Sequence, residues 1–138
     1  MDRAFRLRVY FENAAGRVEE DPAGFLRTTW NPVMRQPEDT RAVFVHMMRG
    51  LSHNQWSRIL INQLNMPPFS AQEQEWVAQE WLPQAVKAGY RYGAVVVSTD
   101  VMVRLATAYI TTQAPASALT YRSFETDAEA VAWLLQQK

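Results

Sequence analysis

Residues 57–100 have the sequence SRILINQLNMPPFSAQEQEWVAQEWLPQAVKAGYRYGAVVVSTD, and this stretch decides the fold class. Two short apolar runs, Ile59 to Ile61 and Ala94 to Val97, are typical of strands that are buried on both faces. Roughly 30 residues separate these runs, which is the length that a crossover helix needs to return the chain to a parallel neighbour. The stretch therefore predicts two parallel strands inside a sheet, connected by a helix.

The segment between the two strands carries its own helix signals. Ser70 and Glu73 have the spacing of a capping box, in which the serine oxygen accepts from the third backbone N–H and the glutamate bonds back to the cap. Gly89 predicts the end of the helix. Pro83 lies inside it and has no N–H to donate to Gln79, so we expect a kink or break there.

The chain before this unit predicts an antiparallel meander. Apolar side chains occur at every second position from Phe5 to Phe11, which is the pattern of a strand with one buried and one solvated face. Residues 13–16 predict a turn, after which residues 17–20 return as a short hairpin arm. Residues 24–30 then form a third strand, rich in β-branched and aromatic side chains.

Helices and one more strand complete the predicted order. Pro37 suits the first position of a helix, and two acidic residues follow it at the positive end of the helix dipole. After the second buried strand, Thr99 or Asp100 is suited to cap another helix. The predicted core stripe of that helix consists of Met102, Leu105, Ala106, Tyr109 and Ile110. Residues 119–124 predict a strand near an edge, and Thr126 opens a second capping box.

In chain order the predicted elements are β-β-β-α-β-α-β-α-β-α. A meander followed by alternating strands and helices predicts a mixed sheet with helices packed on it. We therefore expect an α/β fold with about five strands flanked by about four helices, in a single domain over residues 1–138.

The composition limits the classes of function. Fourteen basic residues balance 14 acidic ones, so no net field attracts nucleic acid. Cysteine is absent, which excludes disulfides, thiolate nucleophiles and Cys-based metal sites. No apolar run reaches the ~20 residues of a membrane span, and the first residues lack the apolar region of a signal peptide. We expect a cytoplasmic protein that neither binds nucleic acid nor inserts into a membrane.

Several packing residues resemble those of the small STAS-like proteins of bacteria, which are related in fold to anti-sigma-factor antagonists. The likeness rests on residues 59–62, Ser70, Trp76, residues 81–83, Gly89 and residues 94–97, and on Phe124 and residues 130–134 in the tail. It covers most of the chain from Gly24 onward. The resemblance implies a four- or five-stranded sheet flanked by helices. It also implies a role in regulatory binding without catalysis, in bacterial signalling or stress response.

The resemblance also bears on phosphorylation. Antagonist STAS domains carry a phosphorylatable serine in an Asp-x-Ser setting, at a helix start just after a central strand. Here residues 62–69 are NQLNMPPF, which contain no acid, and Ser70 is the first serine after the strand. Ser70 is therefore the position that corresponds to a phospho-switch, although the acidic setting is missing.

No local pattern favours catalysis or metal binding. His46 and His53 are the only histidines, and no carboxylate pattern beside them completes a metal site. Ser98, Asp100 and a histidine have the residue types of a catalytic triad. However, the chain has no G-x-S-x-G elbow, and helix capping explains residues 98–100 more simply. We expect no enzyme activity, no metal and no cofactor.

Two hypotheses for binding remain open. The first is an interaction domain that recognises a protein partner. The second is a carrier of a small apolar ligand or lipid, by analogy with the CRAL-TRIO lipid-transfer domains. A closed core favours the first hypothesis, whereas an apolar cavity of roughly several hundred Å³ favours the second.

Polar side chains at the ends of two predicted parallel strands are the candidate binding residues, because open α/β sheets usually bind ligands there. They are Asn62, Gln63, Asn65, Ser98, Thr99 and Asp100. The alternative is that these groups only cap helices and end strands. A homodimer is also expected, because Val103 lies off the predicted stripe of its helix and an edge strand is left unpaired.

Overall fold

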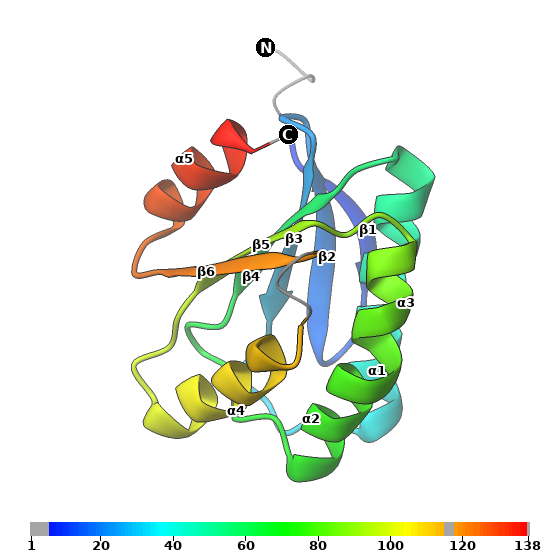
Figure 1. Ribbon diagram of the computed structural model, residues 1–138. Helices are drawn as coiled ribbons and strands as arrows, with labels where there is room; N and C mark the ends of the chain where they lie inside the picture. Colours follow the sequence, from blue (N-terminus) through cyan, green and yellow to red (C-terminus); the bar gives the residue numbers. More distant parts are fainter. Residues whose placement is uncertain (1–5, 115–117, 138) are drawn as a thin grey trace.

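The structure is a computed structural model that describes residues 6–114 and 118–137. Its centre is a six-stranded mixed sheet in which the strands lie in chain order from one edge to the other (Figure 1). The strands are β1 (Arg8–Glu12), β2 (Gly16–Asp21), β3 (Phe25–Trp30), β4 (Arg58–Asn62), β5 (Tyr92–Val96) and β6 (Thr120–Phe124). The predicted α/β fold class is confirmed, and the six strands follow the predicted order of elements, close to the expected number of about five.

Four helical segments pack on the sheet. They are α1 (Pro37–Asn54), a continuous helix made of α2 (Ala71–Trp76), a π-helical turn (Val77–Trp81) and α3 (Leu82–Lys87), then α4 (Val101–Thr112) and α5 (Asp127–Gln136). The predicted helix starts are confirmed, since Pro37 begins α1 and Ser70 caps α2 in a complete capping box with Glu73. Gly89 has φ +115°, a left-handed conformation that ends the long helix as predicted.

The strand pairing explains why the decisive stretch is so apolar. β1, β2 and β3 form the predicted antiparallel meander, and β3 to β6 run parallel to one another. Ile59 pairs with Gly93 and Ile61 with Val95, so β4 and β5 are parallel neighbours away from both edges, as predicted. Both strands are covered on their two faces, because alternate residues belong to two separate apolar cores.

The helices form two unequal layers (Figure 1). α1, the α2–α3 helix and α4 lie on one face of the sheet, over the larger core that contains Leu26, Ile61 and Val95. α5 lies on the opposite face, mainly over β4, β5 and β6. The smaller core beneath it consists of Phe25, Leu60, Ala94, Val96, Ala130 and Leu134.

The π-helical turn lies directly before Pro83. The Leu82 N–H donates to the Val77 carbonyl, five residues back, so the helix is locally wider than an α-helix. Pro83 has no N–H for the normal ladder and its ring crowds the preceding turn. The helix continues through Pro83, so the predicted kink or break takes the form of a local π-helical widening, in which Trp81 lies in the core with only 2% of its surface exposed.

β1 departs from the predicted alternation. A β-bulge lies between Val9 and Phe11, where Tyr10 has no partner on β2. The extra residue shifts the alternation, so Tyr10 and Phe11 both contact the ring of His46 on α1. Leu7 and Val9 are exposed instead of buried. Phe5 lies outside the described residues.

α4 is rotated relative to the prediction. The residues that face the core are Val103, Ala106 and Ile110. Three members of the predicted stripe, Met102, Leu105 and Tyr109, are exposed. The prediction was wrong because apolar side chains surround much of this helix, so their spacing fits more than one orientation.

Polar contacts fix the orientation of α4 instead. The Arg104 Nε donates to the Ser98 carbonyl at 2.5 Å, and the Thr107 hydroxyl donates to Gln63 Oε1 at 2.8 Å. In this orientation Val103 faces the core. The use of Val103 as evidence for a homodimer was therefore wrong, although β1 and β6 are the edge strands of the sheet within one chain.

Candidate functional site

Most of the binding residues predicted at the end of β4 form hydrogen bonds within the chain. Asn62 Oδ1 accepts from the backbone N–H of Leu64 at 2.9 Å. Gln63 is buried, and its side chain joins the β4–α2 loop to Thr107 of α4. Asn65 is exposed in the same loop. The structure therefore brings this loop beside α4, but of the three predicted residues only Asn65 presents an exposed side chain.

The residues predicted after β5 start α4. Ser98 is buried and its Oγ accepts from the N–H of Asp100 at 3.0 Å. Asp100 caps α4, because its Oδ1 accepts from the N–H of Met102 at 2.8 Å. Thr99 is exposed between them. Ser98 and Asp100 thus have the structural roles that the capping alternative describes, and binding by this group stays a prediction.

Ser70 belongs to a polar network that joins α1 to α2. Its Oγ accepts from the N–H of Glu73, whose carboxylate accepts from the N–H of Ser70. The same carboxylate accepts two bonds from Arg35, at 2.9 and 3.2 Å, and one from the Thr40 hydroxyl at 2.5 Å. Burial alone raises the pKa of Glu73, but these hydrogen bonds outweigh it and lower the pKa below its ordinary 4.5.

This network stands beside a groove of about 320 Å³. Arg35 also donates to the carbonyls of Pro67 and Pro68, so its guanidinium bonds are all made within the chain. Arg41 lies over the ring of Trp76, with 5.2 Å from the guanidinium carbon to the ring centroid. The cations of this groove are thus engaged by carboxylate, carbonyl or aromatic groups, which identifies a structural clamp.

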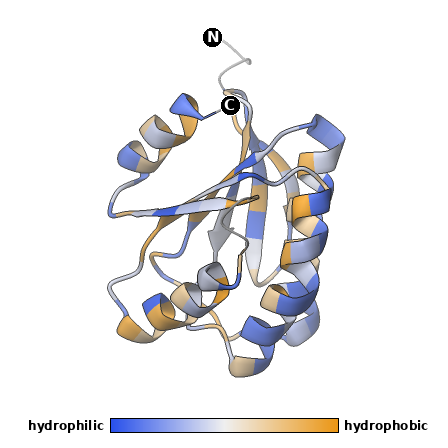
Figure 2. Cartoon of the chain, viewed as in Figure 1, coloured by the Kyte–Doolittle hydropathy of each residue, from blue (hydrophilic) through white to orange (hydrophobic). Residues whose placement is uncertain are grey.

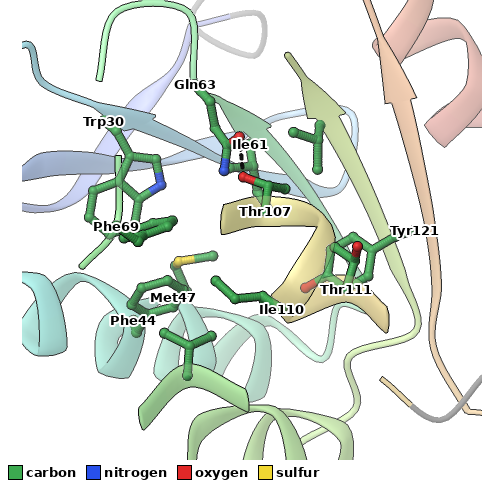
Figure 3. Close-up of a pocket in the computed structure, with 12 residues that line it drawn as sticks. Trp30, Phe44, Met47, Ile61, Gln63, Phe69, Thr107, Ile110, Thr111 and Tyr121 are labelled. Carbon is green, nitrogen blue, oxygen red and sulfur yellow. Dashed lines mark hydrogen bonds between the residues drawn. The ribbon is translucent and has the colours of Figure 1, made fainter. Parts of the chain in front are cut away.

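A small cavity lies between the sheet and the three helices of the larger layer (Figure 3). Aromatic and aliphatic side chains line most of it, with the Gln63–Thr107 hydrogen bond at one side. Its volume is about 30 Å³, enough for a water molecule but not for a lipid. Burial raises the pKa of the lining residue Tyr121 to about 12, so its phenol stays neutral near neutral pH.

A larger crevice opens at the carboxyl ends of β5 and β6. It has a volume of about 350 Å³. Its lining residues are Val97, Arg104, Thr107, Ala108, Thr111, Ser123, Phe124 and Glu125. We call it the Arg104 crevice. Thr107 and Thr111 also line the small internal cavity, so these two side chains separate the crevice from the core.

None of the crevice residues was among the predicted binding residues. A single arginine on a helix gives no signal in the sequence, because exposed arginines are common. Its neighbours Ser123 and Glu125 come from another strand, so only the packing of α4 against β6 brings the groups together. The crevice lies at the carboxyl ends of parallel strands, the same end of the sheet as the predicted binding residues, and binding there stays a prediction.

The outward side of α4 carries a second feature. Val101, Met102 and Leu105 have 64%, 60% and 59% of their surface exposed, and Tyr109 has 38%. Figure 2 shows the first turn of α4 as strongly hydrophobic. We call these four residues the α4 apolar face. Tyr109 also donates a hydrogen bond to Glu75 of α2, which anchors one end of the face.

The placement of the titratable side chains and the length of the helices bear on metal binding and membrane spanning in the part of the chain that the structure describes. Within it, no group of three or more His, Asp or Glu residues is placed to hold a metal ion. His46 bonds the carbonyl of Ala42 and stacks on Phe11. No helix in the same ranges is long and apolar enough to cross a membrane.

Comparison with known proteins adds no relative. No family model, curated protein or solved structure matches the chain.

Proposed function

We propose that the protein is a non-enzymatic regulatory domain of the STAS-like kind, which binds a protein partner in bacterial signalling. The single observation that carries the proposal is the α4 apolar face. Large apolar side chains grouped on one exposed helix side are a common mark of a protein interface. Elsewhere on this helix the chain buries its apolar residues, as Val103 and Ile110 demonstrate.

The geometry of the face suits a helical partner. Val101, Leu105 and Tyr109 follow one another at intervals of four residues, so they form a ridge along α4. Ridges of this spacing pack into the grooves of another helix. Met102 lies beside the ridge and adds a flexible side chain that adapts to different partners. The expected partner therefore presents an amphipathic helix with aliphatic side chains.

The small volume of the cavity inside the core favours a protein partner over the carrier hypothesis. Sites for drug-sized ligands have volumes of about 300–1,000 Å³ and enclose most of the ligand. The cavity inside the larger core has about 30 Å³. A lipid would need α4 to separate from Val77 and the other residues beneath it, whereas a protein partner needs no rearrangement of the core.

The test compares two lysine substitutions. Leu105→Lys places a charge in the centre of the α4 apolar face, and Leu135→Lys places one on α5, where Leu135 is similarly exposed at 52%. Each tagged variant is cross-linked in its native host, purified and analysed by native mass spectrometry. We expect a defined partner with the wild-type chain and with Leu135→Lys, and its loss with Leu105→Lys while the melting temperature is unchanged.

The same measurement tests the predicted homodimer. A second copy of the chain on the α4 apolar face appears as a doubled mass that Leu105→Lys removes. A partner that Leu105→Lys retains contradicts an interface at α4. A co-purifying lipid in place of a protein contradicts the proposed function and supports the carrier hypothesis.

A further inference from the structure

The Arg104 crevice lies where the chain changes sides of the sheet. β5 and β6 are adjacent parallel strands. The connection after β5 leads to α4 in the larger helical layer, whereas the connection after β6 leads to α5 on the opposite face (Figure 1). Two neighbouring connections that part in this way leave a crevice at the carboxyl ends of their strands, and open α/β sheets bind ligands at such points.

Arg104 is the charged group that faces this crevice and is held in place. Its Nε donates to the Ser98 carbonyl at 2.5 Å, which fixes the plane of the guanidinium. The two terminal nitrogens remain as donors. Within residues 6–114 and 118–137, no carboxylate lies within 4.0 Å of Arg104, in contrast to the paired Arg27 and Arg35. A guanidinium that is fixed through its Nε and has no carboxylate partner can present a planar pair of N–H groups to a bound oxyanion.

The polar side chains that line the crevice beside Arg104 determine which anion can bind. The hydroxyls of Thr107 and Thr111 donate to Gln63 and to the carbonyl of Ala108, so their oxygens can only accept from a ligand. Glu125 adds a negative charge to the rim of the crevice. This wall disfavours a doubly charged phosphate group, because only one arginine offsets the charge while Glu125 repels it.

Val97, Ala108 and Ser123 line the rest of the crevice beside Arg104. Phe124 also borders it, although its ring packs on Trp133 of α5. The volume of about 350 Å³ lies at the lower end of the range for small-molecule sites. The crevice therefore combines one oriented cation with a partly apolar wall in a space that suits a small ligand.

We propose that the Arg104 crevice binds a small organic monocarboxylate with an apolar or aromatic body. The carboxylate bonds the terminal nitrogens of Arg104, and the body lies between Val97 and Ala108. Because α4 supplies Arg104 from the side next to the α4 apolar face, ligand and partner occupy different sides of one helix. The proposal does not depend on the protein interaction described above.

Benzoate is the probe, with benzamide as its uncharged counterpart of nearly the same shape. Each is titrated into the ¹⁵N-labelled protein while the amide signals are followed by NMR. We expect benzoate to shift the signals of Val97, Ser123 and Glu125 in a saturable way, with benzamide at least about tenfold weaker because it lacks the ionic part of the bidentate bond.

Two arginine variants locate the site. Arg104→Gln removes the guanidinium, and we expect a loss of benzoate affinity of at least about tenfold. Arg122→Gln is the matched control, since Arg122 is an exposed neighbour on β6 whose register partner Ala94 belongs to the core under α5. It removes the same charge from the other face of the sheet, and we expect benzoate affinity to be retained.

Three results overturn the proposal. They are shifts that do not saturate or do not cluster at the crevice, equal binding of benzamide, and equal losses in Arg104→Gln and Arg122→Gln. Binding of benzoate to Leu105→Lys at wild-type affinity, together with loss of the protein partner, separates this site from the α4 apolar face. Loss of benzoate binding in Leu105→Lys would contradict the assignment to separate sides of α4.

Discussion

The two faces of the sheet are stabilised in different ways. The face under α1, the α2–α3 helix and α4 holds a continuous aromatic and aliphatic core, in which Phe44 contacts the rings of Trp30 and Trp81. The opposite face has an apolar core only where α5 covers it. Beyond α5, β2 alternates the core residue Val18 with Arg17 and Glu19, which are more exposed.

Charged side chains form rows on this uncovered part. Arg17 pairs with Glu12 at 3.0 Å and lies 3.9 Å from Glu19. Arg27 pairs at 2.8 Å with both Asp21 and Asp127, which ties β2 and β3 to the start of α5. Burial of apolar area contributes far more free energy per residue than solvated ion pairs do. The face under α1, the α2–α3 helix and α4 therefore provides most of the stability of the sheet, whereas the partly open face contributes little free energy.

The largest effect is expected at Trp81. Its Nε1 donates to the Phe44 carbonyl at 2.6 Å, and its ring contacts Phe44 and Tyr90. Trp81→Ala should lower the free energy of unfolding by about 3–5 kcal/mol, because it removes buried area and leaves a cavity. Denaturant unfolding measures the change. Trp133→Ala on the half-buried side of α5 is the comparison, and an equal or larger loss there would contradict the difference between the faces.

A medium effect is expected at the clamp between α1 and α2. The folded-state pKa of Glu73 is lowered, so the carboxylate adds stability above its unfolded pKa near 4.5, and this stability is lost as the pH falls through the folded value. Glu73→Gln keeps the shape of the capping box but not the charge. The loss of unfolding free energy in Glu73→Gln, relative to the wild-type chain, should be largest at neutral pH and should become smaller below pH 4.5. A deficit that is independent of pH would contradict the assigned role of the charge.

The smallest effect is expected on the uncovered part of the sheet. Arg17→Ala removes an ion pair whose two side chains are nearly half exposed. We expect a change below about 1 kcal/mol that disappears in high salt. Arg27→Ala is the control, because Arg27 is less exposed and bonds two carboxylates, and should cost more. A larger loss from Arg17→Ala, measured in the same unfolding experiment, would show that this face contributes more than the comparison states.

The strong local patterns predicted the elements correctly. Unbroken runs such as Ile59 to Ile61 indicate burial on both faces, and Ser70 with Glu73 marks a helix start through bonds within four residues. Such signals depend on nearby residues only, so the tertiary structure does not change them. The irregular helical turn before Pro83 is a local effect too, because the missing N–H is a property of the proline itself.

Orientation and juxtaposition were decided by the tertiary structure. Met102 and Leu105 have the spacing of a core stripe, yet they are exposed, because α4 packs on the sheet through Val103, Ala106 and Ile110. The bulge at Tyr10 likewise exposes Val9. A periodic apolar pattern predicts that an element has an apolar face. It does not predict which segment packs on that face, because this depends on contacts between segments that are distant in the sequence.

Residue patterns alone were enough to predict the α/β fold class and the parallel pair β4 and β5. The packing of distant segments was needed to show that Gln63 bonds Thr107 of α4, and that Arg104 lines a crevice together with Ser123 and Glu125. The difference arises from the sequence separation over which each interaction acts. Apolar period and capping act within one or two turns of chain, whereas a crevice forms from residues that meet only when α4 and β6 pack together.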